Sequence, residues 1–236
     1  MDTLYIVMPA YNEEANIKEI IKEWYPIIEE RSADSRLVII DDGSRDMTWQ
    51  ILSKEADKRP KLIALTKPNG GHGAAVLFGY RYAIEQGADY IFQTDSDGQT
   101  LPSEFAAFWR RRKRYAMVIG KRSSRQDGFL RKVVSFVLRL TCFVCFQVSL
   151  PDVNTPYRLM KAEALKEALA LIPEDYNLAN VMVSVIFAKK EFPIRYLPIT
   201  FRPRQGGVNS INMKKIGTIG VRAVKDFVRF AVRGFQ

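Results

Sequence analysis

Hydrophobic and polar positions follow two alternating patterns along the first hundred residues. Apolar runs of strand length occur at 4–8, 37–40, 62–65 and 90–94. Between them, apolar residues recur at helical spacing over 13–30, over a stretch ending at 56 and over another ending at 85. This alternation predicts an α/β fold, a mostly parallel sheet covered by helices. We expect the first strand to break at Pro9, because proline donates no ladder hydrogen bond.

Acidic or turn-forming residues stand where three of these four strands end. The three loops read Pro9-Ala-Tyr-Asn-Glu13, Asp41-Asp-Gly-Ser44 and Asp95-Ser-Asp97. Ligands of such sheets bind beyond the carboxyl ends of the strands, where the loops carry the chemistry. We therefore place the candidate site at this edge of the sheet.

Asp95 and Asp97 are the strongest local signal for chemistry. Two carboxylates separated by one residue can converge on a hard divalent cation, and Gln99 can add a neutral oxygen. Mg²⁺ or Mn²⁺ bound in this way keeps positions open for substrate phosphates. The alternative is a pair of turn-forming aspartates before Gly98.

Carboxylates after the first two strands are suited to a nucleoside. Asp41, Asp42 and Glu13 could accept hydrogen bonds from a base or ribose, and Tyr11 is available for stacking. Structurally, Asp42 with the glycine after it is also a good turn, and Glu13 a good helix start.

The turn Asn69-Gly-Gly-His-Gly73 superficially resembles a phosphate cradle. Backbone amides at a helix start favour anions, but the segment lacks the Lys-Ser/Thr of a P-loop. We therefore favour a tight turn that carries a surface histidine, His72.

The second half of the chain is less regular. We expect a helix over 102–113, a strand over 116–120 and a long apolar helix over 129–150. Arg139 lies near the middle of that last segment, and a spanning helix tolerates few charges. The segment therefore predicts a helix at a membrane interface, with Arg131, Ser135 and Arg139 on one side. Its two cysteines, Cys142 and Cys145, are expected to be buried structural thiols in a reducing compartment.

The segment 213–233 has a second basic helical face. Arg222, Lys225, Arg229 and Arg233 share that face, and apolar residues including Phe227 and Phe230 lie away from it. A basic amphipathic helix is typical of a membrane-surface element. The alternative is a helix that packs on the domain through its apolar face.

Net charge is +10 and unevenly spread along the 236 residues. Residues 110–139 hold eleven Lys/Arg and one acid, and residues 201–236 hold eight and one. Such clusters favour an anionic partner, namely phosphates, acidic lipid headgroups or nucleic acid. A solvated surface is the alternative.

No recognised nucleic-acid motif is present, so we expect no nucleic-acid partner. A non-catalytic module that binds nucleotides or nucleic acid remains the minor hypothesis.

Four motifs in register carry a family resemblance over residues 3 to about 205. P-A-Y-N-E, D-D-G-S, N-G-G-H-G-A-A and D-S-D-G-Q-x-x-P resemble those of family 2 glycosyltransferases with the GT-A fold. The likeness is greatest to polyprenyl-phosphate sugar transferases of the dolichol-phosphate mannose synthase-like branch. Asp152–Arg158 resembles that branch's D-x-x-x-x-x-R element, with Pro156 where a glycine is common.

The resemblance implies roles for the matching residues. Donor nucleotide-sugar contacts would come from Pro9, Ala10, Tyr11, Glu13, Asp41, Asp42, Gly71, Asp95 and Arg122. Asp95, Asp97 and Gln99 would hold Mg²⁺ or Mn²⁺. Asp97, Asp152 and Arg158 would act in catalysis, and donor or acceptor phosphates would meet Arg122, Arg158, Arg202, Arg204 and Ser210.

The resemblance also implies a function and an organisation. We expect an inverting, metal-dependent transfer of a hexose from a UDP- or GDP-sugar to a polyprenyl phosphate, with a glycan or protein hydroxyl as the alternative acceptor. We expect a catalytic domain over 1–205 and a basic amphipathic helix over 206–236. The chain would be cytoplasmic and peripheral at the inner membrane face, in contact with anionic lipid, and a membrane-protein partner or a homo-oligomer is possible.

Overall fold

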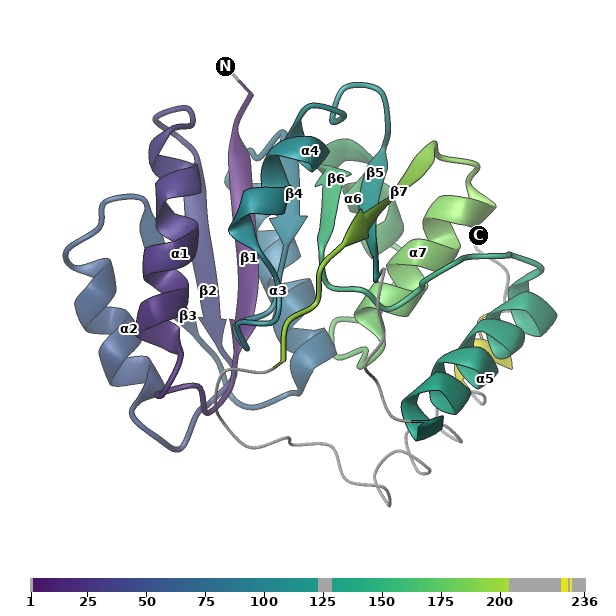
Figure 1. The fold of residues 1–236 in the computed structure, drawn as a ribbon, viewed down its shortest axis with the longest axis horizontal. Helices are drawn as coiled ribbons and strands as arrows, with labels where there is room; N and C mark the ends of the chain where they lie inside the picture. The colour runs from purple at the N-terminus through teal and green to yellow at the C-terminus, as the bar shows by residue number, and fades with distance from the viewer. Residues whose placement is uncertain (1, 123–128, 204–225, 229, 231–236) are drawn as a thin grey trace.

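The computed structural model describes residues 2–122, 129–203, 226–228 and 230. Within these ranges the strands form a seven-stranded sheet in the order β3-β2-β1-β4-β6-β5-β7 (Figure 1). Only β6 runs against its neighbours, pairing antiparallel with both β4 and β5. The strands are β1 (Leu4–Ala10), β2 (Arg36–Asp41), β3 (Leu62–Thr66), β4 (Tyr90–Gln93), β5 (Met117–Arg122), β6 (Arg158–Lys161) and β7 (Ile194–Ile199).

Helices cover both faces of this sheet (Figure 1). One face is packed by α1 (Ile17–Glu29), α2 (Thr48–Ala56) and α4 (Phe105–Trp109), the last entered through the 3-10 turn η1 (Pro102–Glu104). The other face is packed by α3 (His72–Glu85), α6 (Ala162–Leu169) and α7 (Ala179–Lys189), with α5 (Phe129–Phe146) beside α7. The α/β architecture predicted from the alternating patterns is thus confirmed.

Strand alternation divides the core into two layers. In β1, Leu4 and Ile6 face the α1 side, whereas Tyr5 and Val7 face the α3 side, because side chains along a strand point alternately to opposite faces. Trp24 of α1 is fully buried and its ring lies 5.5 Å from that of Phe92 in β4. Burial of such a side chain contributes roughly 1.5–3 kcal/mol.

β1 does not break at Pro9 but continues to Ala10. Pairing of β1 with β4 ends at Val7, whereas pairing with β2 continues through Pro9. The Pro9 carbonyl accepts a hydrogen bond from the Ser96 hydroxyl, on the side where β4 has ended. The missing proline N–H therefore costs no ladder hydrogen bond, which is why the strand tolerates this residue.

Two helices are shorter than their apolar patterns indicate. The α4 helix ends at Trp109, and Arg111 and Arg112 donate side-chain hydrogen bonds to the carbonyls of Ala107 and Trp109. The α5 helix ends at Phe146, where Gln147 takes a left-handed backbone conformation with φ 54°. Left-handed residues commonly end helices, so the segment 147–150 leaves the helical path.

The described part of the C-terminal segment packs on the domain. Phe227 is buried, with its ring 5.5 Å from that of Phe146 in α5, and Phe230 lies 5.4 Å from Tyr176. The rest of the predicted basic helix, and the side chains of Arg131 and Ser135, lie outside the described residues. No helix within the described ranges is both long and apolar enough to cross a bilayer.

Both cysteines are free thiols. Cys142 is buried in the core, where burial raises the pKa of its thiol to about 12, whereas Cys145 is only partly buried. The expectation of buried thiols therefore holds fully for Cys142 only.

Candidate functional site

The carboxyl ends of β1, β2, β3, β4, β5 and β7 lie at one edge of the sheet, because these strands run in the same direction. The loops predicted to carry chemistry all leave from this edge. It corresponds to the lower edge of the sheet in Figure 1. Segments that are 80 or more residues apart in sequence thus become neighbours there.

The loop after β4 presents every second side chain to solvent. Asp95, Asp97 and Gln99 are half-buried, while the residues between them are buried. The Ser96 hydroxyl bonds to the Pro9 carbonyl at 2.8 Å, which anchors the loop to β1. The three predicted metal-binding side chains therefore share the accessible side of a well-anchored loop.

His72 lies against this loop, which the sequence interpretation missed. It is the first residue of α3, and its Nε2 is 3.0 Å from Asp95 Oδ1. Burial disfavours the charged ring, but Asp95, Asp97 and Asp42 together hold the imidazole pKa above its ordinary value. Of these three carboxylates, Asp95 is the one that contacts the imidazole directly. A single histidine directly after two glycines at a predicted helix start was the available signal.

These oxygens fit a hard divalent cation. Mg²⁺ and Mn²⁺ are commonly bound through one or two carboxylates, with substrate phosphates and water completing the shell. Asp95 and Asp97 supply such carboxylates, and Gln99 can present Oε1 because its Nε2 donates to the Arg202 carbonyl at 3.0 Å. Among the described residues no group of three His, Cys, Asp or Glu side chains could enclose a metal alone. A cation here would therefore need the oxygens of a bound phosphate.

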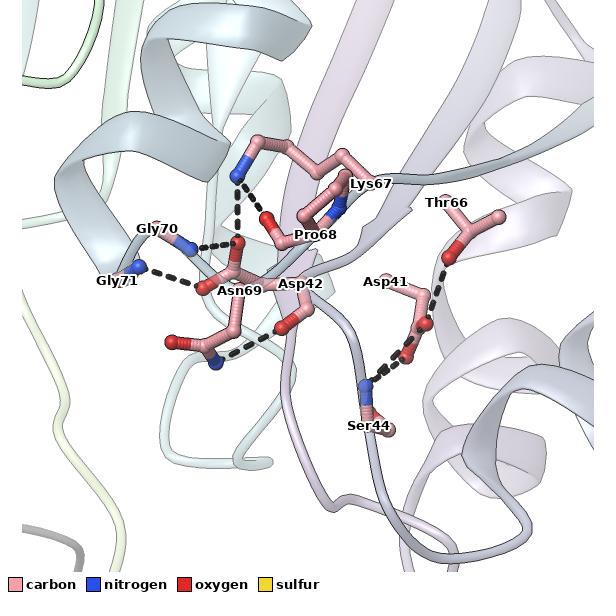
Figure 2. Close-up of polar contacts among 9 residues, drawn as sticks. All are labelled: Asp41, Asp42, Ser44, Thr66, Lys67, Pro68, Asn69, Gly70 and Gly71. Atoms are coloured by element: carbon pink, nitrogen blue, oxygen red, sulfur yellow. Dashed lines mark hydrogen bonds and ion pairs between the residues drawn. The ribbon is translucent and has the colours of Figure 1, made fainter.

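Asp42 is buried at the end of β2, and its carboxylate is held by the segment that precedes α3 (Figure 2). Oδ1 accepts from Lys67 Nζ at 2.8 Å and from the Gly70 amide at 3.0 Å, while Oδ2 accepts from the Gly71 amide at 2.8 Å. The amides that were considered as a phosphate cradle are thus occupied by the chain's own carboxylate. Asp42 shapes the loop from Lys67 to Gly71, and its backbone carbonyl also accepts a hydrogen bond from the side-chain Nδ2 of Asn69.

Asp41 is also buried and internally bonded. Its carboxylate accepts from the Thr66 hydroxyl at 3.0 Å and from the Ser44 amide at 3.3 Å (Figure 2). Gly43 lies between Asp42 and Ser44 in the chain and has φ 67°. A Cβ atom at this position would lie 2.8 Å from the backbone nitrogen of Asn69. The Asp-Asp-Gly-Ser spacing is therefore required by the way the two loops pack together.

The loops after β1 and β2 are joined by reciprocal hydrogen bonds. The Asn12 side chain accepts from the Arg45 amide, Glu14 accepts from the Met47 amide, and the Glu13 amide donates to the Thr48 hydroxyl. Pro9 and Ala10 are buried strand residues, whereas Tyr11 is half-buried in the loop. Glu13 is buried and accepts from the Asn16 side chain at 2.8 Å. Of these residues, Tyr11 is the one with an accessible ring.

Arg202 follows β7 and is tied to the candidate metal loop. Its amide donates to the Gln99 carbonyl at 2.8 Å, but its guanidinium points to Glu23 of α1, at 3.1 Å. Arg204 and Ser210 lie outside the described residues. The structure therefore places the backbone of Arg202, rather than its charge, beside Gln99.

Arg122 and Asp152 meet near the end of β5. Arg122 Nε lies 3.9 Å from Asp152 Oδ2, and its guanidinium stacks 4.5 Å from the centre of the Phe201 ring. Asp152 is buried and also accepts from the Asn154 amide. The charge of the predicted catalytic aspartate is therefore partly balanced by the predicted phosphate-binding arginine.

Arg158 occupies a different environment from the expected phosphate contact. It is fully buried at the start of β6, and burial lowers the pKa of its guanidinium. Its nitrogens donate to the carbonyls of Thr155 and Asn180 and to the Ser184 hydroxyl. In this arrangement Arg158 fixes the loop that precedes β6 against α7 and does not reach the accessible side of the edge.

The chain is similar in sequence to curated proteins that are named as sugar transferases acting on polyprenyl phosphates. A dolichyl-phosphate beta-glucosyltransferase of Trichomonas vaginalis is 25% identical over 178 residues, which cover 68% of this chain and 54% of the relative. An undecaprenyl-phosphate 4-deoxy-4-formamido-L-arabinose transferase of Pseudomonas fluorescens is 27% identical, covering 70% and 48%. The chain spans about half the length of these curated relatives.

Solved structures share the fold. Glucosyl-3-phosphoglycerate synthase from Mycobacterium tuberculosis, in complex with phosphoglyceric acid, superposes with a TM-score of 0.67 at 18% identity, covering 96% of this chain and 79% of that one. The same synthase with Mn²⁺, UDP and glucosyl-3-phosphoglycerate gives 0.65 at 16% identity, covering 96% and 78%. These likenesses confirm the predicted fold class.

The family assignment rests on a match through most of the sheet. The profile described as Glycosyl transferase family 2 matches residues 5–169, which span β1 to α6 and contain the acidic loops of the candidate site. The chain belongs to Glycosyl transferase family 2.

Proposed function

We propose that this chain transfers a hexose, with inversion, from a UDP- or GDP-sugar to a polyprenyl phosphate at the cytoplasmic face of a membrane. The observation that carries the proposal is the accessible Asp95–Asp97–Gln99 row at the carboxyl edge of a family 2 sheet. Relatives named for dolichyl-phosphate and undecaprenyl-phosphate acceptors support the acceptor class.

The donor would lie across the loops after β1, β2 and β4. Tyr11 stacks on the base, while Glu13 and Asp42 maintain the shape of the nucleoside-binding loops through the hydrogen bonds that join them. Asp95, Asp97 and Gln99 hold Mg²⁺ or Mn²⁺, which when bound neutralises the charge developing on the departing diphosphate. Arg122 contributes a cation at the end of β5 for donor or acceptor phosphate.

The acceptor chemistry requires no strong general base. An ionised phosphate oxygen attacks the anomeric carbon, the bond from that carbon to the donor's diphosphate breaks, and the nucleoside diphosphate leaves with the bonding electrons. A sugar or protein hydroxyl would instead need a base to take its proton. Asp152 lies beside the Arg122 guanidinium and acts as a positioning partner for this arginine.

An exposed apolar stripe on α5 supports contact with a membrane. Phe136, Val137, Leu140, Phe143 and Val144 are 49–70% exposed. They fall within an arc of about 120° on the helix surface, at 100° per residue. A stripe of this kind beside the exposed, charged Arg139 is suited to the headgroup boundary of a bilayer. Such contact would bring the lipid-borne phosphate to the protein.

The test is a transfer assay with labelled UDP- and GDP-sugars, Mn²⁺ or Mg²⁺, and polyprenyl phosphate presented in anionic vesicles. We expect a labelled, chloroform-soluble product that is lost by at least about 100-fold in D95N. The charge-matched control D57N, at an exposed position of α2's end, should retain full activity.

Two results would contradict the proposal. One is the absence of lipid product with every donor while the protein remains folded. The other is labelled product on a glycan or protein acceptor but none on the polyprenyl phosphate. Equal activity of wild type and F143S/V144S on vesicle-borne acceptor would remove the membrane part of the proposal.

A further inference from the structure

A concave basic surface lies at the opposite edge of the sheet from the acidic loops. It has a volume of about 570 Å³ and is lined by Arg110, Arg111, Arg114, Tyr115 and Arg195. We call these five residues the arginine cleft. The first four belong to the turn between α4 and β5, and Arg195 is the second residue of β7. The cleft exists because β5 and β7 pair in parallel, which places their starting ends side by side.

The four arginines of this cleft have no acidic partner within the part of the chain that the structure describes. The neighbouring Arg112 pairs with Asp2 at 2.7 Å, but no ion pair among the described residues includes a cleft arginine. Arg110, Arg114 and Arg195 are exposed, and Arg111 uses one nitrogen to bond the Ala107 carbonyl. Four cations therefore converge on one concavity without a carboxylate to balance them.

The cleft is held in place by rigid surroundings. Arg112, within the same turn, stacks 4.2 Å from the centre of the Trp109 ring, and Trp109 in turn packs on Phe105 of the core. Tyr115 is half-buried and lies two residues before the start of β5. The guanidinium groups are thus presented from a fixed turn and a strand, so less ordering is required when a ligand binds.

Distance separates this cleft from the candidate donor site and from α5. The cleft residues lie where β5 and β7 begin, whereas Arg122 is the last residue of β5. Six residues of strand at about 3.3 Å each put roughly 20 Å between the two ends. A bilayer that touches α5 at one edge of the sheet would therefore not cover the arginine cleft at the other.

We propose that the arginine cleft is a binding site for a small polyanion that carries two or more phosphoryl groups. Guanidinium groups form paired hydrogen bonds with phosphate oxygens, and several of them can share the charge of one polyphosphate. The volume falls within the roughly 300–1,000 Å³ typical of small-ligand sites. A concave site of this size favours a compact ligand over the extended backbone of a nucleic acid.

The experiment is calorimetric titration of metal-free protein, in EDTA, with sodium tripolyphosphate and with pyrophosphate. Removing divalent cations keeps the candidate donor site from contributing, so the result does not depend on the proposed transfer activity. We expect saturable binding that survives in D95N and weakens at least tenfold in R110Q/R114Q/R195Q. The control variant K18Q/K54Q/K189Q loses the same charge at exposed positions elsewhere and should bind as wild type does.

Other outcomes would overturn the proposal. These are the absence of binding heat in the wild type, equal weakening in the two triple variants, or binding of RNA or anionic vesicles through the cleft without binding of the small anions. Should R110Q/R114Q/R195Q fail to fold by circular dichroism, the single variant R195Q serves in its place, with an expected weakening of at least threefold. An unchanged affinity in R195Q would then count against the site.

Discussion

Two sets of charged side chains, one at each edge of the sheet, differ in their burial and in their hydrogen-bonding partners. At the carboxyl edge, Asp41, Asp42 and Arg158 are buried, and each is surrounded by hydrogen-bonding partners from its own fold. At the amino edge, the cleft arginines are exposed or half-buried and have no carboxylate partner among the described residues. Charges of the first kind maintain the structure, because removing one leaves buried partners unsatisfied. Charges of the second kind contribute little to the fold and are available for a ligand.

The sharpest way to break this comparison is to replace one arginine from each edge by methionine. R158M should lower the free energy of unfolding by about 3 kcal/mol, because the Thr155 and Asn180 carbonyls lose a buried donor. R195M should change it by less than about 0.5 kcal/mol, since that side chain is exposed and has no ion pair to lose. Urea unfolding with equal m values measures both. Similar losses in the two variants would show that the distinction between the edges is wrong.

A smaller effect is expected for D42N. Asparagine keeps one acceptor oxygen, so either Lys67 and the Gly70 amide or the Gly71 amide would face an NH2 group, and we expect a loss of about 2 kcal/mol. D57N, at an exposed position, is the matched control and should stay within about 0.5 kcal/mol of wild type. Thermal or urea unfolding of both variants gives the comparison. If D42N were as stable as its control, the carboxylate would not be holding the loop.

The smallest effect concerns Asp2, which forms an ion pair with Arg112 in the turn that carries three of the cleft arginines. A hydrogen bond from Arg112 holds the pKa of Asp2 below its ordinary value of about 3.9, despite burial acting in the opposite direction. A depressed pKa adds stability that is present above about pH 4 and is lost as the pH falls through the folded-state pKa. We expect D2N to lose roughly 0.5 kcal/mol at pH 7, and we expect this loss to shrink as the pH falls below about 4. Unfolding midpoints measured from pH 7 to pH 3 would reveal a constant difference if this assignment were wrong.

Local patterns predicted much of the fold but little about pairing between distant segments. The strand and helix sequence up to residue 94 could be predicted, because hydrophobic periodicity depends on neighbours in the chain. The same reasoning stopped β1 at Pro9, since it could not show that β4 ends before reaching that level. The reversal of β6 likewise depends on tertiary pairing, for which a single sequence gives no direct signal.

The candidate site shows the same division. The accessible positions of Asp95, Asp97 and Gln99 agree with their alternate spacing in the sequence, while their role in metal binding stays a prediction. The partners of Asp42 lie 25 to 29 residues away, so its buried role was not visible from the sequence. Arg158 was predicted at a phosphate from the resemblance of residues 152–158 to the D-x-x-x-x-x-R element of the family. The carbonyls that enclose it come from α7 and from the loop before β6, and only the folded chain brings them together.

The reversed direction of β6 has a consequence for α5. Because β5 leaves the sheet at the acidic edge and β6 re-enters at that same edge, the 35 intervening residues form an excursion with both ends anchored on one side. Unlike the helix of a βαβ connection, α5 does not have to carry the chain to the opposite edge of the sheet. The direction of one strand therefore gives the segment that carries α5 the same edge of the sheet as the Asp95 loop for both of its attachment points.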